Sequence, residues 1–210
     1  MPGPFESPEK SRWNKTETPN ITTAVVTNNK DKEGLGRVKV QYPWSGKNDE
    51  SHWARIATMM AGPKRGSYFL PEVDDEVLVT FINGDVEFPV IIGMLWSKAD
   101  LPPETNDDGK NNIRKIRSRS GHEIVFDDSA EAKSEKLELH SAGGQKIVLD
   151  DSKGSEKILI EDQGGGKIEF DSTAKRISIT SSMEIIMESN NITLKAGGIL
   201  TLQGGLVKIN

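Results

Sequence analysis

The side chains best suited to acid–base or metal chemistry include three histidines, which lie far apart in the sequence. His52, His122 and His140 form no His-x-His or His-Glu-x-x-His spacing. A catalytic triad needs a base held next to a nucleophile, and scattered histidines favour separate surface positions instead. The sequence therefore predicts no catalytic residue, no metal ligand and no cofactor.

Four clusters of acidic residues are the other candidates for chemistry. They are Asp74-Asp75-Glu76, Asp127-Asp128, Asp150-Asp151 and Glu161-Asp162. Paired carboxylates can hydrolyse glycosides or bind calcium. The last three clusters, however, recur after successive short apolar segments, where Asp accepts hydrogen bonds from the local backbone of turns. We interpret them as turn residues, with calcium binding as the alternative.

Four aromatic side chains, Trp44, Trp53, Phe81 and Phe88, could form a platform that stacks bases or sugars. Core packing and contacts between neighbouring barrels explain them as well. The formal net charge of -5 argues against nucleic acid as a ligand, because phosphate binding needs clustered Lys and Arg. A nucleic-acid partner is therefore not expected.

The strands that position these residues belong to a chain with unusually few hydrophobic residues. Only 34% of the 210 residues are hydrophobic, against roughly 45–50% (with glycine counted) in typical globular domains. No cysteine is present, so disulfides and thiol chemistry are excluded. Either part of the chain is disordered, or the chain buries its apolar residues against another molecule.

Composition divides the chain into four segments. Residues 1–20 are rich in proline and predict a flexible arm, and this arm lacks the apolar core of a signal peptide. Residues 21–97 hold eight of the twelve aromatic residues, residues 98–112 form a polar linker, and residues 113–210 form a repeat. We expect the chain to be made in the cytoplasm.

The first folded segment contains five or six short strand patterns. The clearest are residues 21–27, 37–42, 76–82 and 89–96, with Asn83-Gly84 as a hairpin signal between the last two. So many short strands in about 75 residues predict a small closed β-barrel of the OB-fold type.

The repeat, residues 113–210, contains pairs of apolar residues at i and i+2 that are separated by polar, often glycine-containing turns. The step between pairs falls from 10–11 residues near Leu137 to 7–8 residues near the C-terminus. The pairs are Ile124/Phe126, Leu137/Leu139, Ile147/Leu149, Ile158/Ile160, Ile168/Phe170, Ile177/Ile179, Ile185/Met187, Ile192/Leu194, Leu200/Leu202 and Val207/Ile209.

Residues at i and i+2 of a strand share one face, so each strand offers two apolar side chains to one side. Units of about eight residues are too short to enclose a core within one chain, but they can supply one side of a three-sided prism. We therefore predict an all-β chain with an intertwined trimeric β-helix after the barrel. The alternative is an ordinary antiparallel meander. The predicted trimer axis contains Ile147, Leu149, Ile158, Ile160, Ile168, Phe170, Ile177, Ile179, Ile192, Leu194, Leu200 and Leu202.

Three ordered segments resemble the VgrG and phage baseplate spike family: residues 34–44, 71–81 and 84–93. Residues 116–128 are similar to that family's entry into its β-helix. The motif positions are Gly36, Arg37, Pro43, Trp44, Pro71, Glu76, Gly84, Asp85, Pro89 and Gly93. One position departs from the family, because Asp74 stands where a turn glycine is usual.

The resemblance implies an OB-fold barrel, a homotrimeric needle and a role at the tip of a contractile injection machine. It implies hub, tube or baseplate proteins as partners on the N-terminal side, and contact with a membrane only during piercing. Family members carry a hub-like module ahead of the barrel, so the chain is expected to be either a short spike or a fragment. The last apolar residues remain in register, which predicts a PAAR-type tip protein bound at Val207, Lys208, Ile209 and Asn210. The alternative is a trimeric tail protein that binds or degrades carbohydrate.

Overall fold

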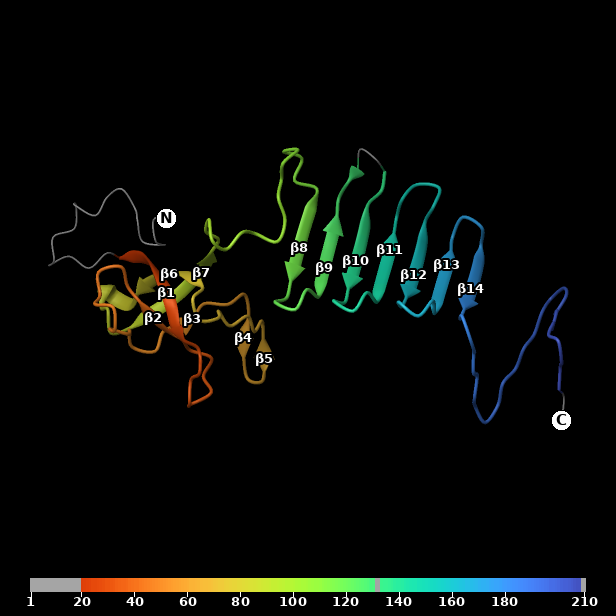
Figure 1. The fold of residues 1–210 in the computed structure, drawn as a ribbon, viewed down its shortest axis with the longest axis horizontal. Coiled ribbons are helices and arrows are strands. Elements are labelled where there is room, and N and C mark those ends of the chain that lie inside the picture. The colour runs from red at the N-terminus through yellow and green to blue at the C-terminus, as the bar shows by residue number, and fades with distance from the viewer. Residues whose placement is uncertain (1–19, 131–132, 209–210) are drawn as a thin grey trace. The chain divides into compact units, whose positions relative to one another are not determined.

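The computed structural model describes residues 20–130 and 133–208, which contain strands, turns and one short 3₁₀ turn (Figure 1). The chain forms two compact units that divide between Pro102 and Pro103, inside the predicted linker. Among the described residues, no helix is long and apolar enough to cross a membrane. The first unit contains β1 (Ile21–Asn28), β2 (Lys39–Gln41), β3 (Arg55–Ile56), β4 (Ala61–Gly62), β5 (Arg65–Gly66), β6 (Glu76–Phe81), η1 (Ile82–Gly84) and β7 (Pro89–Leu95).

The five main strands of the first unit form one sheet in the order β2-β1-β6-β7-β3. Backbone hydrogen bonds in both directions between Val38 and Ala54 join the β2 side to the β3 side. This bridge closes the sheet on itself, as the predicted small barrel requires. The unit is therefore OB-like, and the strand predictions for residues 21–27, 76–82 and 89–96 are confirmed.

The barrel core follows from the alternation of side chains along each strand. In β6, Val77, Val79 and Phe81 are buried while the residues between them are partly exposed. Ala24 and Val26 of β1 point into the same core, which is also filled by Val38, Val40 and Ile91. Small β-branched residues dominate it because a five-stranded barrel encloses little volume.

Turn geometry explains two features of the barrel loops. Asn83 and Gly84 have φ of 55° and 75°, which confirms the turn predicted between β6 and β7. Asp74 has φ of 78°, a left-handed conformation that glycine adopts at much lower cost. This positive φ explains why the family motif usually has glycine at this position.

The second unit is a seven-stranded antiparallel sheet in sequence order from β8 to β14 (Figure 1). Its strands are β8 (Ile113–Arg117), β9 (Glu123–Asp127), β10 (Lys136–His140), β11 (Lys146–Asp150), β12 (Lys157–Glu161), β13 (Lys167–Asp171) and β14 (Arg176–Thr180). The apolar pairs predicted from the sequence lie opposite one another, as Leu149 does with Ile158 and Leu137.

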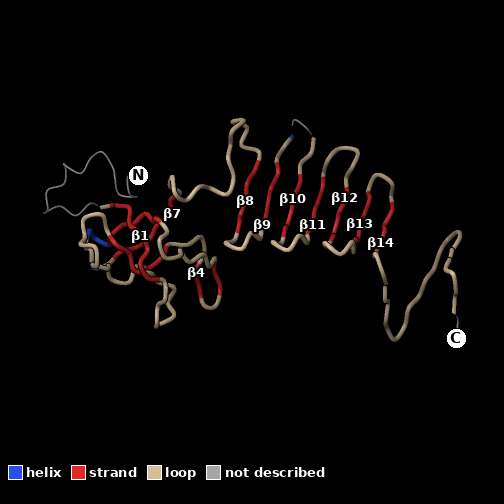
Figure 2. The backbone as a smooth tube through the Cα atoms, viewed as in Figure 1, coloured by secondary structure: helices blue, strands red, loops and turns tan. Residues whose placement is uncertain are grey.

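Within one chain, residues 113–180 therefore form the antiparallel meander that was the alternative prediction. Residues 181–208, all of them described, form no strand and no ladder, as Figure 2 shows beyond β14. The C-terminal part of the repeat thus lacks strand partners within its own chain. The intertwined β-helix stays a prediction.

Candidate assembly interface

The seven-stranded sheet has one apolar face, and nothing in the described part of the chain covers it. Strand alternation places both members of each apolar pair on this face, together with Ile116 of β8. Most of these side chains are exposed, with Ile158 at 44% and Ile179 at 57% of their full area. We call this surface the apolar wall. Its exposed members are Ile116, Phe126, Leu139, Ile147, Leu149, Ile158, Ile160, Phe170, Ile177 and Ile179.

The opposite face of the same sheet is already covered by its own charged side chains. Val125, Val148 and Leu159 run down its centre and are buried. Long side chains from neighbouring strands pair across them, such as Lys146 Nζ with Glu161 Oε2 at 2.9 Å. This lysine lowers the pKa of the Glu161 carboxyl. The sheet thus has one face covered by its own charged side chains and one apolar face that the described residues leave exposed.

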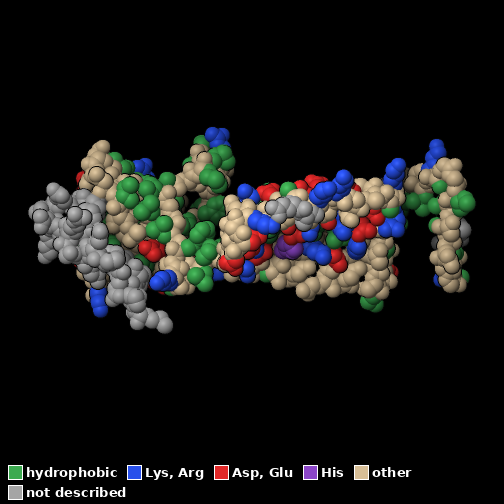
Figure 3. All heavy atoms as spheres, turned by 90° about the horizontal axis from the view of Figure 1, so that it is seen from above, with side chains coloured by type: hydrophobic (Ala, Val, Ile, Leu, Met, Phe, Trp, Pro, Cys, Tyr) green, Lys and Arg blue, Asp and Glu red, His purple; other side chains and the backbone are tan. Residues whose placement is uncertain are grey.

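The acidic clusters of the sheet unit serve turns, as predicted. An Oδ1 oxygen of Asp150 accepts the backbone N–H of Ser152 at 2.9 Å, and that of Asp127 accepts the N–H of Ser129 at 3.0 Å. Burial alone would raise the pKa of Asp150, but hydrogen bonds from Ser152 hold that pKa below its usual value. Charged side chains gather over the sheet unit in Figure 3.

The turns that follow β8, β10 and β12 share one hydrogen-bonding pattern. Each begins with Ser or Asp, whose side-chain oxygen accepts the backbone N–H four residues later, and each has a glycine with positive φ just before that N–H. The three turns begin at Ser118, Ser141 and Asp162, with glycines Gly121, Gly144 and Gly165. Repeating the same turn keeps the strands in one register, and so keeps the apolar wall continuous.

The three histidines do not come together. His122 Nδ1 accepts the N–H of Ala142 at 3.1 Å, and His140 Nε2 lies 3.0 Å from Glu138 Oε2 within one strand. His52 is exposed in a barrel loop. No group of three or more His, Asp and Glu among the described residues has the geometry of a metal site.

In the barrel, the motif residue Arg37 anchors the loop that follows β1. Its guanidinium binds both carboxylate oxygens of Asp31, with Nε 2.8 Å from Oδ2, and Asp31 also accepts the N–H groups of Glu33 and Leu35. Arg37 therefore holds the pKa of Asp31 far below its usual range. The guanidinium lies 5.7 Å from the centre of the Trp53 ring, and Lys39 Nζ lies 5.5 Å from it.

Other motif residues have packing roles. Pro71 and Pro89 are buried, and Pro43 is an exposed turn residue after β2. Gly93 pairs with Leu78 beside the point where Ile92 bulges out of the β6–β7 ladder. An Oδ1 oxygen of Asp85 accepts the N–H of Glu87, next to the Gly84 turn. Glu76 opens β6 opposite Val25, and Gly36 has φ of 69° in the turn before Arg37.

The four aromatic residues do not form one platform. Phe81 is buried and meets Tyr42 edge to face, with ring centres 5.6 Å apart. Trp44 stacks on the other side of Tyr42 at 4.9 Å. Phe88 and Trp53 border a separate groove. Core packing thus accounts for Phe81, whereas Trp44 and Phe88 remain about half exposed.

The remaining predicted site residues are apolar and exposed but are not brought together. Ile192, Leu194, Leu200 and Leu202 lie in the segment without strands, each more than half exposed. Val207 and Lys208 are exposed, while Ile209 and Asn210 lie outside the described residues. Sequence reasoning missed the hairpin β4–β5, which lies where only a Gly/Pro loop was predicted. It also missed Asp31, because a lone Asp in a polar turn gives no signal of its arginine partner.

The described chain thus combines a small five-stranded OB-like barrel with a sheet whose apolar wall is uncovered. Residues 22–96 match the family model described as the type VI secretion system/phage-baseplate injector OB domain. Over this region the chain is similar to the VgrG and baseplate spike family.

Three curated relatives show how the similarity is distributed. The chain is 35% identical over 117 residues to the type VI secretion system spike protein VgrG3 of Vibrio cholerae, covering 52% of this chain and 11% of the relative. It is 32% identical over 114 residues to the actin cross-linking toxin VgrG1 of the same species, covering 50% and 10%. It is 31% identical over 144 residues to the spike protein VgrG1c of Pseudomonas aeruginosa, covering 61% and 19%. The chain thus spans only a tenth to a fifth of these relatives' length.

Proposed function

We propose that this chain is the barrel and needle part of a homotrimeric spike in a contractile injection machine. The observation that carries the proposal is the uncovered apolar wall, which lies on a sheet joined to an injector OB domain. The machine is a type VI secretion system, a phage tail or a related particle. Hub, tube or baseplate proteins are its expected partners on the barrel side.

The dimensions of the wall favour three copies. Five-residue strands span about 17 Å, and three walls of that width place each sheet about 5 Å from a common axis, half of the ~10 Å spacing of packed sheets. Side chains from the three walls then fill the centre. Four such walls would lie about 8 Å from the axis and leave it hollow.

Residues 181–208 support the same assembly. Their apolar pairs continue beyond β14, yet their backbone makes no ladder within the chain. Strands from two other copies would supply the missing hydrogen bonds and cover Ile192, Leu194 and Leu200. A closed rod of this kind has no free edge, which suits mechanical piercing of an envelope when a sheath contracts.

A non-enzymatic role agrees with the turn functions of the acidic clusters and with the separation of the histidines. The carbohydrate alternative needs aromatic residues on the outer face of the needle. The repeat's aromatic residues, Phe126 and Phe170, lie on the apolar wall instead. We further propose that the protein is made in the cytoplasm, enters the particle there and is expelled on contraction.

Light scattering on the purified chain tests the assembly. We expect a mass near 69 kDa, three times the chain mass of 23.1 kDa. A monomer would refute the proposal, and a dimer would replace the three-sided prism by a two-sheet sandwich.

A tip protein of the PAAR type is the proposed partner at the C-terminal end, where Leu206 and Val207 are exposed. Removing residues 200–210 should abolish its binding in a pull-down with purified components. Removal of residues 1–19 is the matched control, since it leaves the needle intact. Unchanged binding after the C-terminal deletion would refute the tip site.

A further inference from the structure

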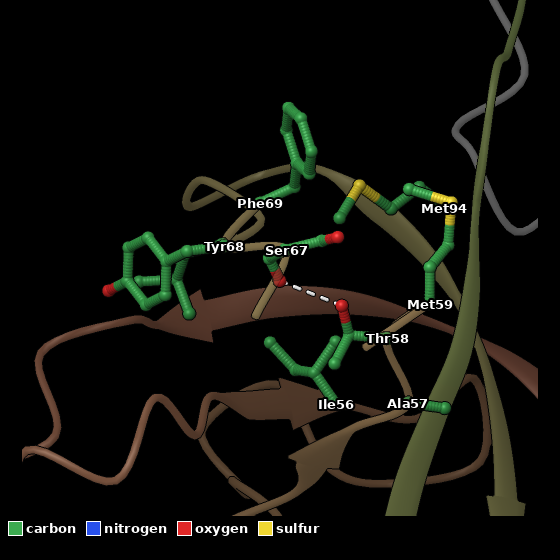
Figure 4. A pocket seen from close by; sticks show the side chains of 9 residues that line it. Ile56, Ala57, Thr58, Met59, Ser67, Tyr68, Phe69 and Met94 are labelled. Carbon is green, nitrogen blue, oxygen red and sulfur yellow. Dashed lines mark hydrogen bonds between the residues drawn. The ribbon is translucent and has the colours of Figure 1, made fainter. Parts of the chain in front are cut away.

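The barrel unit carries a hydrophobic groove that its own core does not use. The groove lies beside the hairpin β4–β5, and its lining includes Met59, Tyr68, Phe69 and Met94 (Figure 4). Met59 and Tyr68 are 88% and 76% exposed. Single exposed apolar residues are ordinary, but a groove lined by two methionines and two aromatic rings is typical of a docking surface.

This groove is held in shape by the backbone. Thr58 Oγ1 donates to the carbonyl oxygen of Ser67 at 2.7 Å, and the Ser67 N–H donates to the carbonyl oxygen of Met60 at 3.0 Å. At Gly66 a Cβ atom would lie 2.5 Å from the Met60 carbonyl oxygen, so only glycine fits there. The groove is therefore preformed, which lowers the entropy lost on docking.

A second apolar patch lies at the other end of β7. Leu35, Ile82 and Phe88 are exposed there around the Trp53 ring and Pro89, and the charged side chains Arg37, Arg55 and Glu87 complete the lining. Pro89 and Met94 are five residues apart on one strand, or about 17 Å. We call the first surface the methionine groove and the second the Phe88 patch. Tyr68 connects them, since its Cε2 lies 3.6 Å from where a Cβ on Gly36 would stand.

We infer that the methionine groove of each barrel packs against the Phe88 patch of the next copy, so that three barrels close into a ring. The inference rests on the proposed trimer. A three-fold ring needs two different complementary patches on each copy, whereas a two-fold dimer needs only one. The barrel offers two such patches at opposite ends of one strand, joined through Tyr68.

Chain continuity supports a second copy as the occupant. β7 ends at Leu95 and β8 begins at Ile113, and a flexible connection of this length has a root-mean-square span of about 23 Å. Barrels tethered to one needle therefore meet at effective concentrations in the millimolar range. At such concentrations even a small apolar contact forms, so each barrel's neighbours are the first surfaces that its groove encounters.

The absence of cysteine makes a direct test possible, because introduced cysteines are the only thiols. Full-length chain carrying both Phe69→Cys and Phe88→Cys is treated with a bis-maleimide and run on a denaturing gel. We expect covalent dimers and trimers, roughly tenfold or more above a control with Phe69→Cys and Lys47→Cys, because the contact holds the two thiols together. Lys47 lies in an exposed loop outside both surfaces.

Light scattering on the same samples separates this inference from the proposed function. A trimer whose cross-linking equals that of the Lys47 control overturns the ring contact and leaves the trimeric needle standing. It would also point to a hub protein as the partner of the groove. Equal cross-linking by Phe69→Cys alone overturns the pairing of two different patches. A monomer overturns both proposals.

Discussion

Replacing Ile160 by serine tests whether the apolar wall is an interface. Ile160 lies in the middle of the sheet on β12 and is 43% exposed in the single chain. Burying a whole isoleucine side chain contributes about 1.5–3 kcal/mol, so the part still exposed is worth about 0.6–1.3 kcal/mol per chain. Three copies together then lose about 2–4 kcal/mol of trimer stability.

This loss corresponds to a weakening of the trimer association constant by roughly 30- to 700-fold. Sedimentation over a dilution series, at a fixed and moderate guanidinium concentration, measures that constant. The matched control is Lys157→Ser on the same strand but on the polar face, where Lys157 Nζ lies 3.9 Å from Asp150. This pair lies within one chain and its 3.9 Å separation is long for an ion pair, so the control should shift the association constant at most a few-fold.

The reasoning fails if both variants weaken the trimer equally, because the two faces of the sheet would then be equivalent. It fails as well if Ile160→Ser lowers only the melting temperature of a monomeric wild-type chain. In that case the lower melting temperature would come only from the 57% of the Ile160 side chain that its own sheet already covers.

Five further outcomes follow from particular features of the chain. Asp74→Gly should raise the stability of the barrel unit by about 1 kcal/mol, seen as a higher melting temperature, because it relieves the left-handed backbone at φ of 78°. Tyr42→Phe should be neutral or stabilising by up to about 1 kcal/mol in guanidinium unfolding, because the Tyr42 hydroxyl is buried without a hydrogen bond of normal geometry. The same burial raises the pKa of Tyr42 to about 12, so wild-type stability should fall faster than that of Tyr42→Phe above about pH 10, where the unfolded tyrosine ionises. Arg37 lowers the pKa of Asp31, so the ionised Asp31 stabilises the fold above the ordinary aspartate pKa of about 3.9. This stabilisation is lost as pH falls and Asp31 takes up a proton. The melting temperature of the wild type should therefore decline more steeply below about pH 4 than that of Asp31→Asn. In hydrogen exchange, amides of β9–β13 should be protected in both monomer and trimer, whereas amides of residues 183–207 should be protected only in the trimer. Protection of residues 183–207 in a monomer would contradict the end of the strand ladder at β14.

Much of the fold is visible in the sequence because its signals are local. The i and i+2 pairs set the faces of the sheet, and Asn83-Gly84 marks a turn that needs positive φ at both positions. The features that sequence reasoning missed depend on specific pairs of residues that follow no repeating spacing. The Asp31–Arg37 ion pair and the bridge from Val38 to Ala54 leave no periodic pattern.

The hairpin β4–β5 was missed for a related reason. Two-residue strands bury nothing, and both Ala61 and Gly62 are exposed. Its position is fixed by the steric need for Gly66 and by the bonds of Thr58 and Ser67, not by a hydrophobic pattern. The sequence shows only methionine and aromatic residues near a Gly/Pro loop, and this pattern does not predict a preformed groove.

The low hydrophobic content of 34% takes on a physical meaning once backbone hydrogen bonds are counted with side chains. Strands β8–β14 pair with their neighbours within the chain, while the apolar wall that they form is uncovered by the described residues. In residues 181–208 both the backbone ladder and the apolar side chains lack partners. An isolated chain would leave a bare sheet edge at β14 beside an apolar face, the combination that favours uncontrolled strand addition. The proposed association of identical copies would remove both exposures at once and would place the missing hydrophobic core between chains.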